Sequence, residues 1–142
     1  MKDYTKGVNM ERSEINKKIA EKYDIELAMA VDALLNRMST DYAEWTLRSL
    51  RNEEGDLSQF AAERIGLYAK GLSVSFGRNY IKIISADENQ RTVNGFVNVK
   101  NDKFEYGDLL MAAGWAGPAT NFARGNIFDQ ESWSRVKWTG IS

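Results

Sequence analysis

The stretch from residue 72 to residue 100, LSVSFGRNYIKIISADENQRTVNGFVNVK, decides the fold of this chain. It holds three short runs of β-branched and aromatic residues, with Gly, Asn, Asp and Glu between them. Such runs favour strands, and the residues between them favour turns. The second and third runs, NYIKIIS and RTVNGFVNVK, therefore predict an antiparallel hairpin across residues 86–90.

Strand alternation in the third run places Phe96 on a polar face, between Asn94 and Asn98. Two interpretations of Phe96 are open. It packs against an aromatic residue on a neighbouring strand, or it offers a flat face to a nucleobase, a contact worth about 1–3 kcal/mol. The Asn-Gly pair at 94–95 also allows a tight turn, which would make Phe96 the start of a strand.

The N-terminal half, from Ser13 to about Gly71, has a helical pattern. Ser13 is the expected N-cap of a first, mostly polar helix. A long second helix then ends at Gly55, unless Ser-Thr-Asp at 39–41 divides it. A third helix opens with a capping-box pattern, Asp56 and Gln59, and closes at Gly71. The second helix carries one broad apolar stripe, at Leu27, Val31, Leu34, Leu35, Met38, Tyr42 and Trp45.

Together these patterns predict an α+β fold in one domain, residues 1–142. We expect a flexible N-terminus at 1–12, a helical part at 13–71, and a small antiparallel sheet at 72–142. Asp108 is expected to cap a short helix, LLMAAGW, and SRVKWTG is expected to be extended. One small sheet is too little cover for the helical stripe, so we expect part of the stripe to pack on another copy.

Composition restricts the function. The net charge is −1, which argues against a non-specific DNA or RNA binder. The chain has no cysteine and no histidine, which excludes Ser-His and Cys-His nucleophile pairs and thiolate metal sites. We also find no membrane span and no signal peptide, so the expected location is the cytoplasm. We expect no cofactor and no catalytic residue.

The segment GWAGPATNFARGNIFD, residues 114–129, holds three glycines, the only proline and a single arginine, Arg124. A guanidinium binds phosphate or carboxylate through two parallel hydrogen bonds and also stacks on aromatic rings. Gly125 would let the backbone approach a ligand closely. The alternative is that Arg124 pairs with Asp129 and the glycines make tight turns. The segment has no P-loop or GxGxxG pattern.

Four segments together resemble a family of small phage proteins, the Thoeris anti-defence sponges of type one. They are EKYDIELAMAVDALLNRM, GRNYIKIIS, NGFVNVK and FEYGDLLMAAGWAGPATNFARGNIFD. The likeness covers nearly the whole chain in length and order, and its most specific part is residues 114–129. Thoeris is a bacterial defence in which a TIR protein makes a cyclic ADP-ribose isomer from NAD, and this signal activates an effector that depletes NAD.

The resemblance implies a phage protein in the host cell cytoplasm that binds this isomer, the 1''-3' glycocyclic form, without cleaving it. It also implies an even-numbered homo-oligomer, with a hexamer as the expected form. Some members of the family hold cyclic di- or trinucleotides of the CBASS defence at a second site. No DNA or membrane partner is implied.

The resemblance also implies site residues, by residue type and approximate spacing. Phe96 would stack on the adenine, with Phe104 as its rival, and Arg124 would hold the pyrophosphate. The helical arginine would be Arg48, with Arg51 behind it. The family's asparagine is assigned to Asn94, and the second ligand site to Gly77 and Arg78.

Two other functions remain open from the sequence. One is an interaction protein that inhibits a host protein by direct surface contact through the helical stripe. The other is an enzyme, for which only carboxylates such as Asp108, Asp129 and Glu105 are available, at spacings that match no mechanism.

Overall fold

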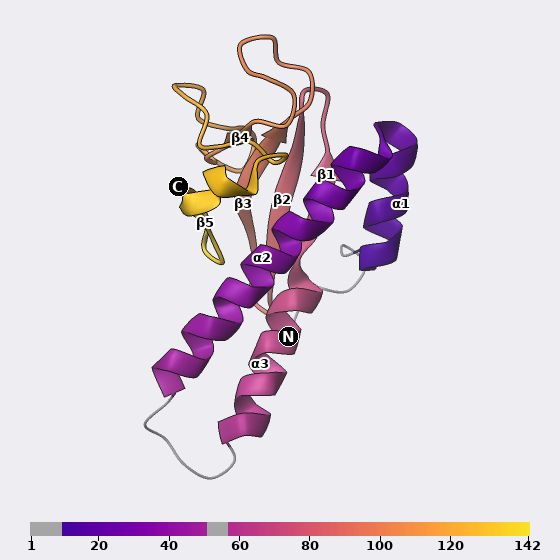
Figure 1. Ribbon diagram of the computed structural model, residues 1–142. Coiled ribbons are helices and arrows are strands. Elements are labelled where there is room, and N and C mark those ends of the chain that lie inside the picture. Colours follow the sequence, from indigo (N-terminus) through magenta and orange to yellow (C-terminus); the bar gives the residue numbers. More distant parts are fainter. Residues whose placement is uncertain (1–9, 51–56) are drawn as a thin grey trace.

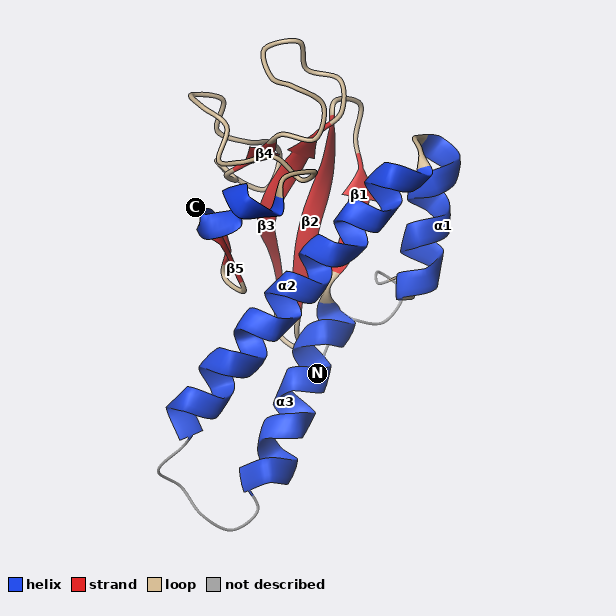
Figure 2. Ribbon diagram, viewed as in Figure 1, coloured by secondary structure: helices blue, strands red, loops and turns tan. Residues whose placement is uncertain are grey.

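The computed structural model describes residues 10–50 and 57–142, and its α-helices precede its strands in the chain. The helices are α1 (Arg12–Lys22), α2 (Ile25–Leu50) and α3 (Leu57–Gly71). They are followed by β1 (Ser73–Phe76), β2 (Tyr80–Ala86), β3 (Arg91–Asn98) and β4 (Leu109–Leu110). A 3-10 helix, η1 (Gln130–Arg135), then leads to β5 (Val136–Lys137) and β6 (Gly140–Ile141). The predicted α+β class is confirmed (Figure 2).

The first four strands form an antiparallel sheet in the order β1-β2-β3-β4, and β5 and β6 form a separate two-stranded ladder. The helices pack on one face of the larger sheet (Figure 1). The predicted hairpin is confirmed, because β2 ends at Ala86 and β3 begins at Arg91. The Asp87 carboxylate closes this turn by accepting the backbone N–H groups of Asn89 and Gln90 at 2.7 and 2.8 Å.

The apolar stripe of α2 is buried within the chain itself. Its members from Leu27 to Met38 are fully buried, against Ile15 and Ile19 of α1 and against sheet residues such as Ile83. The cover for this part of the stripe therefore comes from α1 as well as from the sheet, within a single chain. The stripe becomes exposed only towards the C-terminal end of α2, where Trp45 is 42% exposed.

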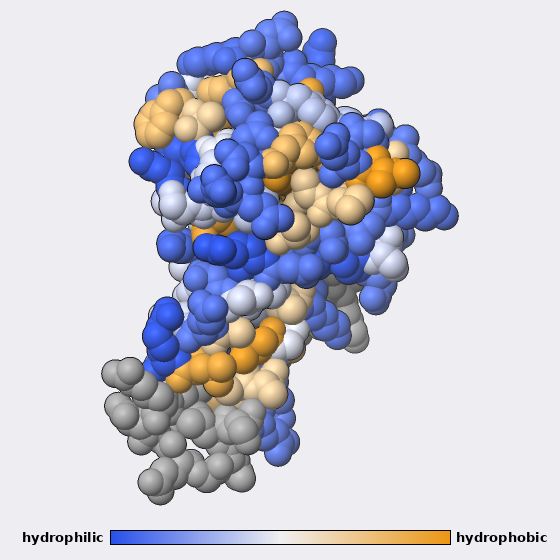
Figure 3. Space-filling view, in the orientation of Figure 1, coloured by the Kyte–Doolittle hydropathy of each residue, from blue (hydrophilic) through white to orange (hydrophobic). Residues whose placement is uncertain are grey.

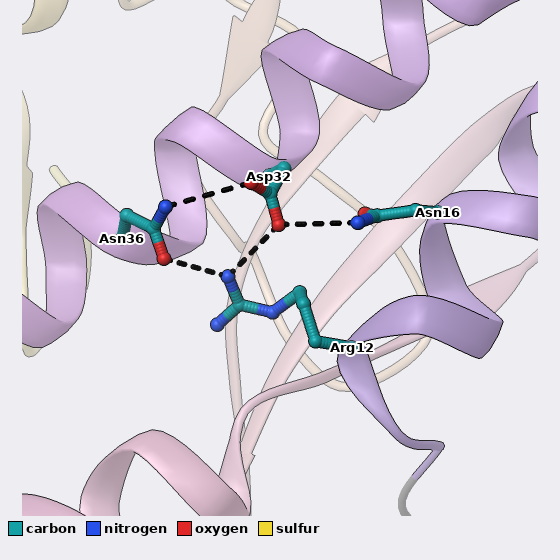
Figure 4. Close-up of polar contacts among 4 residues, drawn as sticks. All are labelled: Arg12, Asn16, Asp32 and Asn36. Carbon is teal, nitrogen blue, oxygen red and sulfur yellow. Dashed lines mark hydrogen bonds and ion pairs between the residues drawn. The ribbon is translucent and has the colours of Figure 1, made fainter.

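A polar cluster fixes α1 on α2 (Figure 4). The Arg12 guanidinium donates to Asp32 Oδ1 at 3.1 Å and to Asn36 Oδ1 at 2.7 Å. Asn16 donates to the same Asp32 oxygen at 3.3 Å. Arg12 therefore belongs to an anchored helix, although a flexible terminus was expected as far as residue 12.

Several expected helix ends differ from the observed ones. Helix α1 begins at Arg12, with Glu11 at the N-cap position and no capping side chain, so Ser13 is not the cap. Helix α2 runs unbroken through residues 39–41, because its apolar stripe continues across them. The cap of α2 is Asp24, which accepts the Leu27 N–H at 2.7 Å. The predicted end at Gly55 and the capping box starting at Asp56 lie outside the described residues.

The expected helix after Asp108 is absent, since Leu109 and Leu110 form β4 and pair with Val97 and Phe96. Both leucines are buried, and a short apolar run fits a strand as well as a helix. Asp108 instead accepts the Glu105 N–H at 2.9 Å and the Asn126 amide at 3.0 Å. The expected extended piece SRVKWTG is partly η1 and partly the β5–β6 ladder. None of the described helices is long and apolar enough to cross a membrane.

Gly71 predicts a local test of the packing of α3 on the sheet. A Cβ at Gly71 would lie 2.0 Å from the Ala86 carbonyl oxygen. Gly71→Ala is therefore expected to lower the free energy of unfolding by about 1–3 kcal/mol, measured by urea denaturation. The matched control is Gly66→Ala in the same helix, where a Cβ meets nothing within 4 Å. That change should stabilise by about 0.5–1 kcal/mol, and effects of the same sign in both variants would contradict the packing.

Candidate functional site

The glycine-rich segment runs back along β4, which brings it next to the sheet. The Leu109 N–H donates to the Gly125 carbonyl at 2.8 Å, and the Arg124 N–H donates to the Leu109 carbonyl at 2.7 Å. Gly125 has a φ of +143°, and a Cβ there would lie 2.7 Å from the Ser132 carbonyl oxygen. This position therefore requires glycine. Because Leu110 pairs with Phe96, the arrangement places Phe96 and Arg124 in neighbouring segments.

Residues 111–119 form a tight loop with Trp115 near its tip. Ala119 N–H donates to the Met111 carbonyl at 2.7 Å, and Ala113 N–H donates to the Gly117 carbonyl at 3.0 Å. The whole stretch 111–124, MAAGWAGPATNFAR, contains no acidic residue. The loop therefore presents an aromatic ring without adding negative charge.

Two cations lie against the Trp115 ring. The Lys82 ammonium is 4.4 Å from the ring centroid, and the Arg91 guanidinium carbon is 4.9 Å from it. The indole is nevertheless 45% exposed. Burial, and then the nearby positive charge of Arg91, lower the pKa of Lys82. The two like charges are thus held close enough to interact unfavourably, and a bound anion would relieve this repulsion.

A second exposed ring, Phe122, has the same kind of neighbours. The Arg124 guanidinium carbon lies 3.9 Å from its centroid and that of Arg135 lies 5.6 Å from it. Both rings belong to the stretch 111–124, and we call the two ring–cation groups, Trp115 with Lys82 and Arg91 and Phe122 with Arg124, together the loop face. In the described part of the chain, its three cations have no carboxylate oxygen within 4.0 Å.

Arg124 is held by neutral groups and is 6% exposed. Its guanidinium donates to Asn121 Oδ1 at 2.8 Å, to the Phe122 carbonyl at 3.2 Å and to Met111 Sδ at 3.3 Å. The alternative pairing with Asp129 is wrong, because Asp129 instead accepts the Glu131 N–H at 3.2 Å and caps η1. A buried charge with neutral partners keeps its positive potential, which favours a nearby anion.

Phe96 is 2% exposed, so its ring has no free face for a base in this conformation. It packs edge-on to Tyr80 of the neighbouring strand at 5.9 Å, as the cross-strand interpretation predicts. The Lys82 ammonium lies 6.0 Å from its centroid. Residues 94–95 lie inside β3, so the alternative of a tight turn there is wrong. Phe96 is thus a buried residue of the sheet that lies beside Lys82.

A β-bulge separates Asn94 from Phe96. Ile83 pairs with Gly95 while Ile84 pairs with Val93, which leaves Asn94 as an extra residue in β3. Its side chain accepts the Ser85 hydroxyl at 3.0 Å and donates to the Trp138 carbonyl at 3.4 Å. Asn94 therefore belongs with Trp138 rather than with Phe96 and Lys82, although regular alternation put Asn94 and Phe96 on one face.

The remaining candidate residues lie apart from the loop face. Arg48 is exposed near the C-terminal end of α2, at the opposite end of the molecule from β4 (Figure 1). Gly77 and Arg78 are exposed in the turn between β1 and β2. Phe104 is half-buried in the loop before β4, with the Lys103 ammonium 5.6 Å from its ring. Arg51 lies outside the described residues.

Sequence reasoning missed four residues of the loop face, namely Lys82, Arg91, Trp115 and Phe122. Trp115 was visible as an aromatic residue between two glycines in an acid-free stretch. Lys82 was visible as a cation on the strand face opposite the buried Ile81 and Ile83. Lys82 and Arg91 come together at the Trp115 ring because of how the 111–119 loop folds. No periodic pattern in the sequence predicts the fold of this loop.

Comparisons with known proteins give no match: no protein-family model, no curated protein and no solved structure is significantly similar to this chain. Among the described residues, no group of three or more acidic side chains is placed to hold a metal ion. The function is therefore inferred from the geometry of the loop face.

Proposed function

We propose that this chain binds and sequesters a nucleotide of the cyclic ADP-ribose type at the loop face, without cleaving it. The observation that carries the proposal is the pair of exposed rings, Trp115 and Phe122, each beside cations that have no carboxylate nearby. A nucleotide combines a planar base with a negatively charged pyrophosphate. An exposed ring can stack on the base, and a cation without a carboxylate nearby can bind the pyrophosphate.

In this arrangement Trp115 takes the place assigned to Phe96 and Phe104, because its ring is the exposed one. The base stacks on the indole, a contact worth about 1–3 kcal/mol. Lys82 and Arg91 hold the pyrophosphate, and each charge-assisted hydrogen bond contributes about 1.5–3 kcal/mol. Arg124 shapes the segment and adds positive potential from beneath Phe122.

Two of the three carboxylates considered for an enzyme are engaged in the fold. Asp108 accepts hydrogen bonds from Glu105 N–H and from Asn126, and Asp129 caps η1. With neither histidine nor cysteine in the chain, sequestration is better supported than hydrolysis. By the resemblance, the protein acts in the host cell cytoplasm as a phage anti-defence factor.

On the basis of the resemblance, we also propose that the chain forms a hexamer. Arg48 lies far from the loop face within one chain, so Arg48 of another copy would reach the site. A second site at Gly77 and Arg78 would take cyclic di- or trinucleotides. Both residues are exposed in a turn, so they are open to such a ligand.

A second function, inhibition of a host protein by surface contact, is favoured by a different observation. The C-terminal end of α2 and the N-terminal end of α3 extend past the sheet (Figure 1) and carry the exposed apolar residues Leu47 and Phe60. Figure 3 shows apolar residues gathered over this part of the molecule. Such a patch is typical of a contact surface.

One experiment separates these functions. The protein is incubated with the 1''-3' glycocyclic ADP-ribose isomer, free ligand is removed by filtration, and the protein is then denatured by heat. A sponge releases intact ligand, while an enzyme releases product. A protein-directed inhibitor leaves all of the ligand in the first filtrate, and this result would contradict the proposal.

Two variants test the site. Trp115→Leu is expected to weaken binding by about tenfold to a hundredfold through loss of stacking. Lys82→Met is expected to weaken it by at least about tenfold through loss of a charged hydrogen bond. The melting temperature of Lys82→Met should stay the same or rise, because the lysine charge is destabilised by burial and by Arg91. Wild-type binding should weaken as pH rises through the lowered pKa of Lys82, where the ammonium loses its charge.

The matched control is Trp45→Leu, which removes a tryptophan of similar exposure from the far end of α2. Calorimetric affinity and thermal stability are measured on all three variants. Equal losses of affinity in Trp45→Leu and Trp115→Leu would show that the ligand is not held at the loop face.

A further inference from the structure

A cavity of about 570 Å³ lies between α2, α3, the β2–β3 turn and the β5–β6 ladder. Four aromatic side chains line it, namely Tyr42, Trp45, Tyr68 and Trp138. We call it the aromatic groove. It shares no residue with the loop face.

The aromatic side chains of the groove pack against one another in fixed orientations. Tyr42 and Tyr68 are stacked, with centroids 4.5 Å apart and planes at 7°. Trp138 stands edge-on to Tyr42 at 5.0 Å, and Trp45 is tilted against Trp138 at 5.0 Å. Trp45 remains 42% exposed, so the groove is open to a ligand at this ring.

Three elements hold the backbone of Trp138 in place. Its N–H donates to Asp41 Oδ2 of α2 at 2.8 Å. Its carbonyl accepts the Tyr68 hydroxyl of α3 at 2.7 Å and the Asn94 amide of β3 at 3.4 Å. The groove is thus preorganised, and a ligand would not have to order it on binding.

The charges around the groove are mainly negative. Asp87 and Glu88 line its edge from the β2–β3 turn, and Asp41 lies behind Trp138. Arg64 also lines the groove, but its guanidinium is exposed and lies against the Phe60 ring at 5.7 Å. Burial, and then the negative charge of Asp41, raise the pKa of Tyr68, which agrees with a negative potential at the groove.

We propose that the aromatic groove is a binding site for a small organic cation of the quaternary-ammonium class. Aromatic faces attract such cations through their negative π surface, and nearby carboxylates add to this attraction. The loop face, by contrast, combines exposed rings with cations and therefore favours an anion. This second site does not depend on the proposed nucleotide binding.

The probe is choline, and its uncharged tert-butyl isostere, neohexyl alcohol, is the comparison. Both are titrated into the full chain while tryptophan fluorescence and heat are recorded, since Trp45 and Trp138 report directly on the groove. Choline is expected to bind saturably, and about tenfold or more tighter than neohexyl alcohol. Equal affinity for the two compounds, or no saturable binding of choline, would overturn the proposal.

Variants locate the site. Trp45→Leu should abolish saturable choline binding, and Glu88→Gln, a change at an exposed side chain, should weaken it. Trp115→Leu should leave choline binding unchanged, although it weakens nucleotide binding. Loss of choline binding in Trp115→Leu with retention in Trp45→Leu would place the cation at the other tryptophan and overturn the proposal.

Discussion

Replacing Trp133 with alanine is expected to lower the free energy of unfolding by about 3–5 kcal/mol, the largest single effect we predict. Trp133 is buried in the core, and its indole N–H donates to the Asn126 carbonyl at 3.0 Å. The side chain therefore fills the core and also anchors the glycine-rich segment. Nucleotide binding at the loop face should be lost together with stability, measured by urea denaturation and calorimetry.

Two controls separate the roles of Trp133. Trp133→Phe keeps most of the buried ring, so it should cost clearly less than the alanine variant. In Trp133→Phe the Asn126 carbonyl loses the indole N–H but still accepts hydrogen bonds from the Asp129 N–H and the Ser132 hydroxyl, at 3.0 and 3.1 Å. Trp115→Ala, at an exposed ring, should change stability by no more than about 0.5 kcal/mol. A Trp133→Ala variant that unfolds at the wild-type urea concentration would show that this indole is not part of the core.

Replacing Arg124 with alanine is expected to reduce both stability and nucleotide affinity. The guanidinium holds Asn121, the Phe122 carbonyl and the Phe122 ring. Hydrogen bonds from a charged donor contribute about 1.5–3 kcal/mol, and we expect a loss of stability in that range. The loop that carries Trp115 and Phe122 loses its support, so affinity for the nucleotide should fall at least about tenfold.

Arg124→Lys should recover only part of this, because an ammonium keeps the charge but cannot stack flat on Phe122 while donating in two directions. Arg37→Ala, at an exposed site on α2, is the control for loss of a positive charge and should not affect stability measurably. Thermal melting with and without nucleotide distinguishes the roles of Arg124. An Arg124→Ala variant with wild-type melting and wild-type affinity would exclude both the structural role of Arg124 and its contribution to nucleotide binding.

The parts of the fold that follow from sequence are those with a regular period. Apolar residues three and four apart on α2 predicted its buried stripe, and β-branched runs around residues 86–90 predicted the hairpin. Leu109 and Leu110 were assigned to a helix because two apolar residues have no period of their own. Their pairing with β3 is a long-range contact, which decides between helix and strand only in the folded chain.

Composition drew attention to one segment of the candidate site but not to the residues around it. The glycine-rich segment and Arg124 stood out by composition, and the structure places both at the loop face. Phe96 was chosen for stacking because alternation put it on a polar face. Exposure could not be read from alternation, since it depends on neighbours in space such as Tyr80, whose ring packs on Phe96.

The bulge at Asn94 means that a single strand serves two surfaces of opposite charge preference. Point substitutions can alter Asn94 without disturbing Phe96, because the two side chains point to different sides of the sheet. A deletion in β3 has a different effect. Removing one residue at 93–95 would restore regular pairing with Ile83 and Ile84, so the strand would lose the extra position that Asn94 occupies in the bulge. The flanking residues would keep their partners, while the contacts of Asn94 with Ser85 and Trp138 would be lost. Homologous chains that keep these contacts should therefore keep the number of residues in β3.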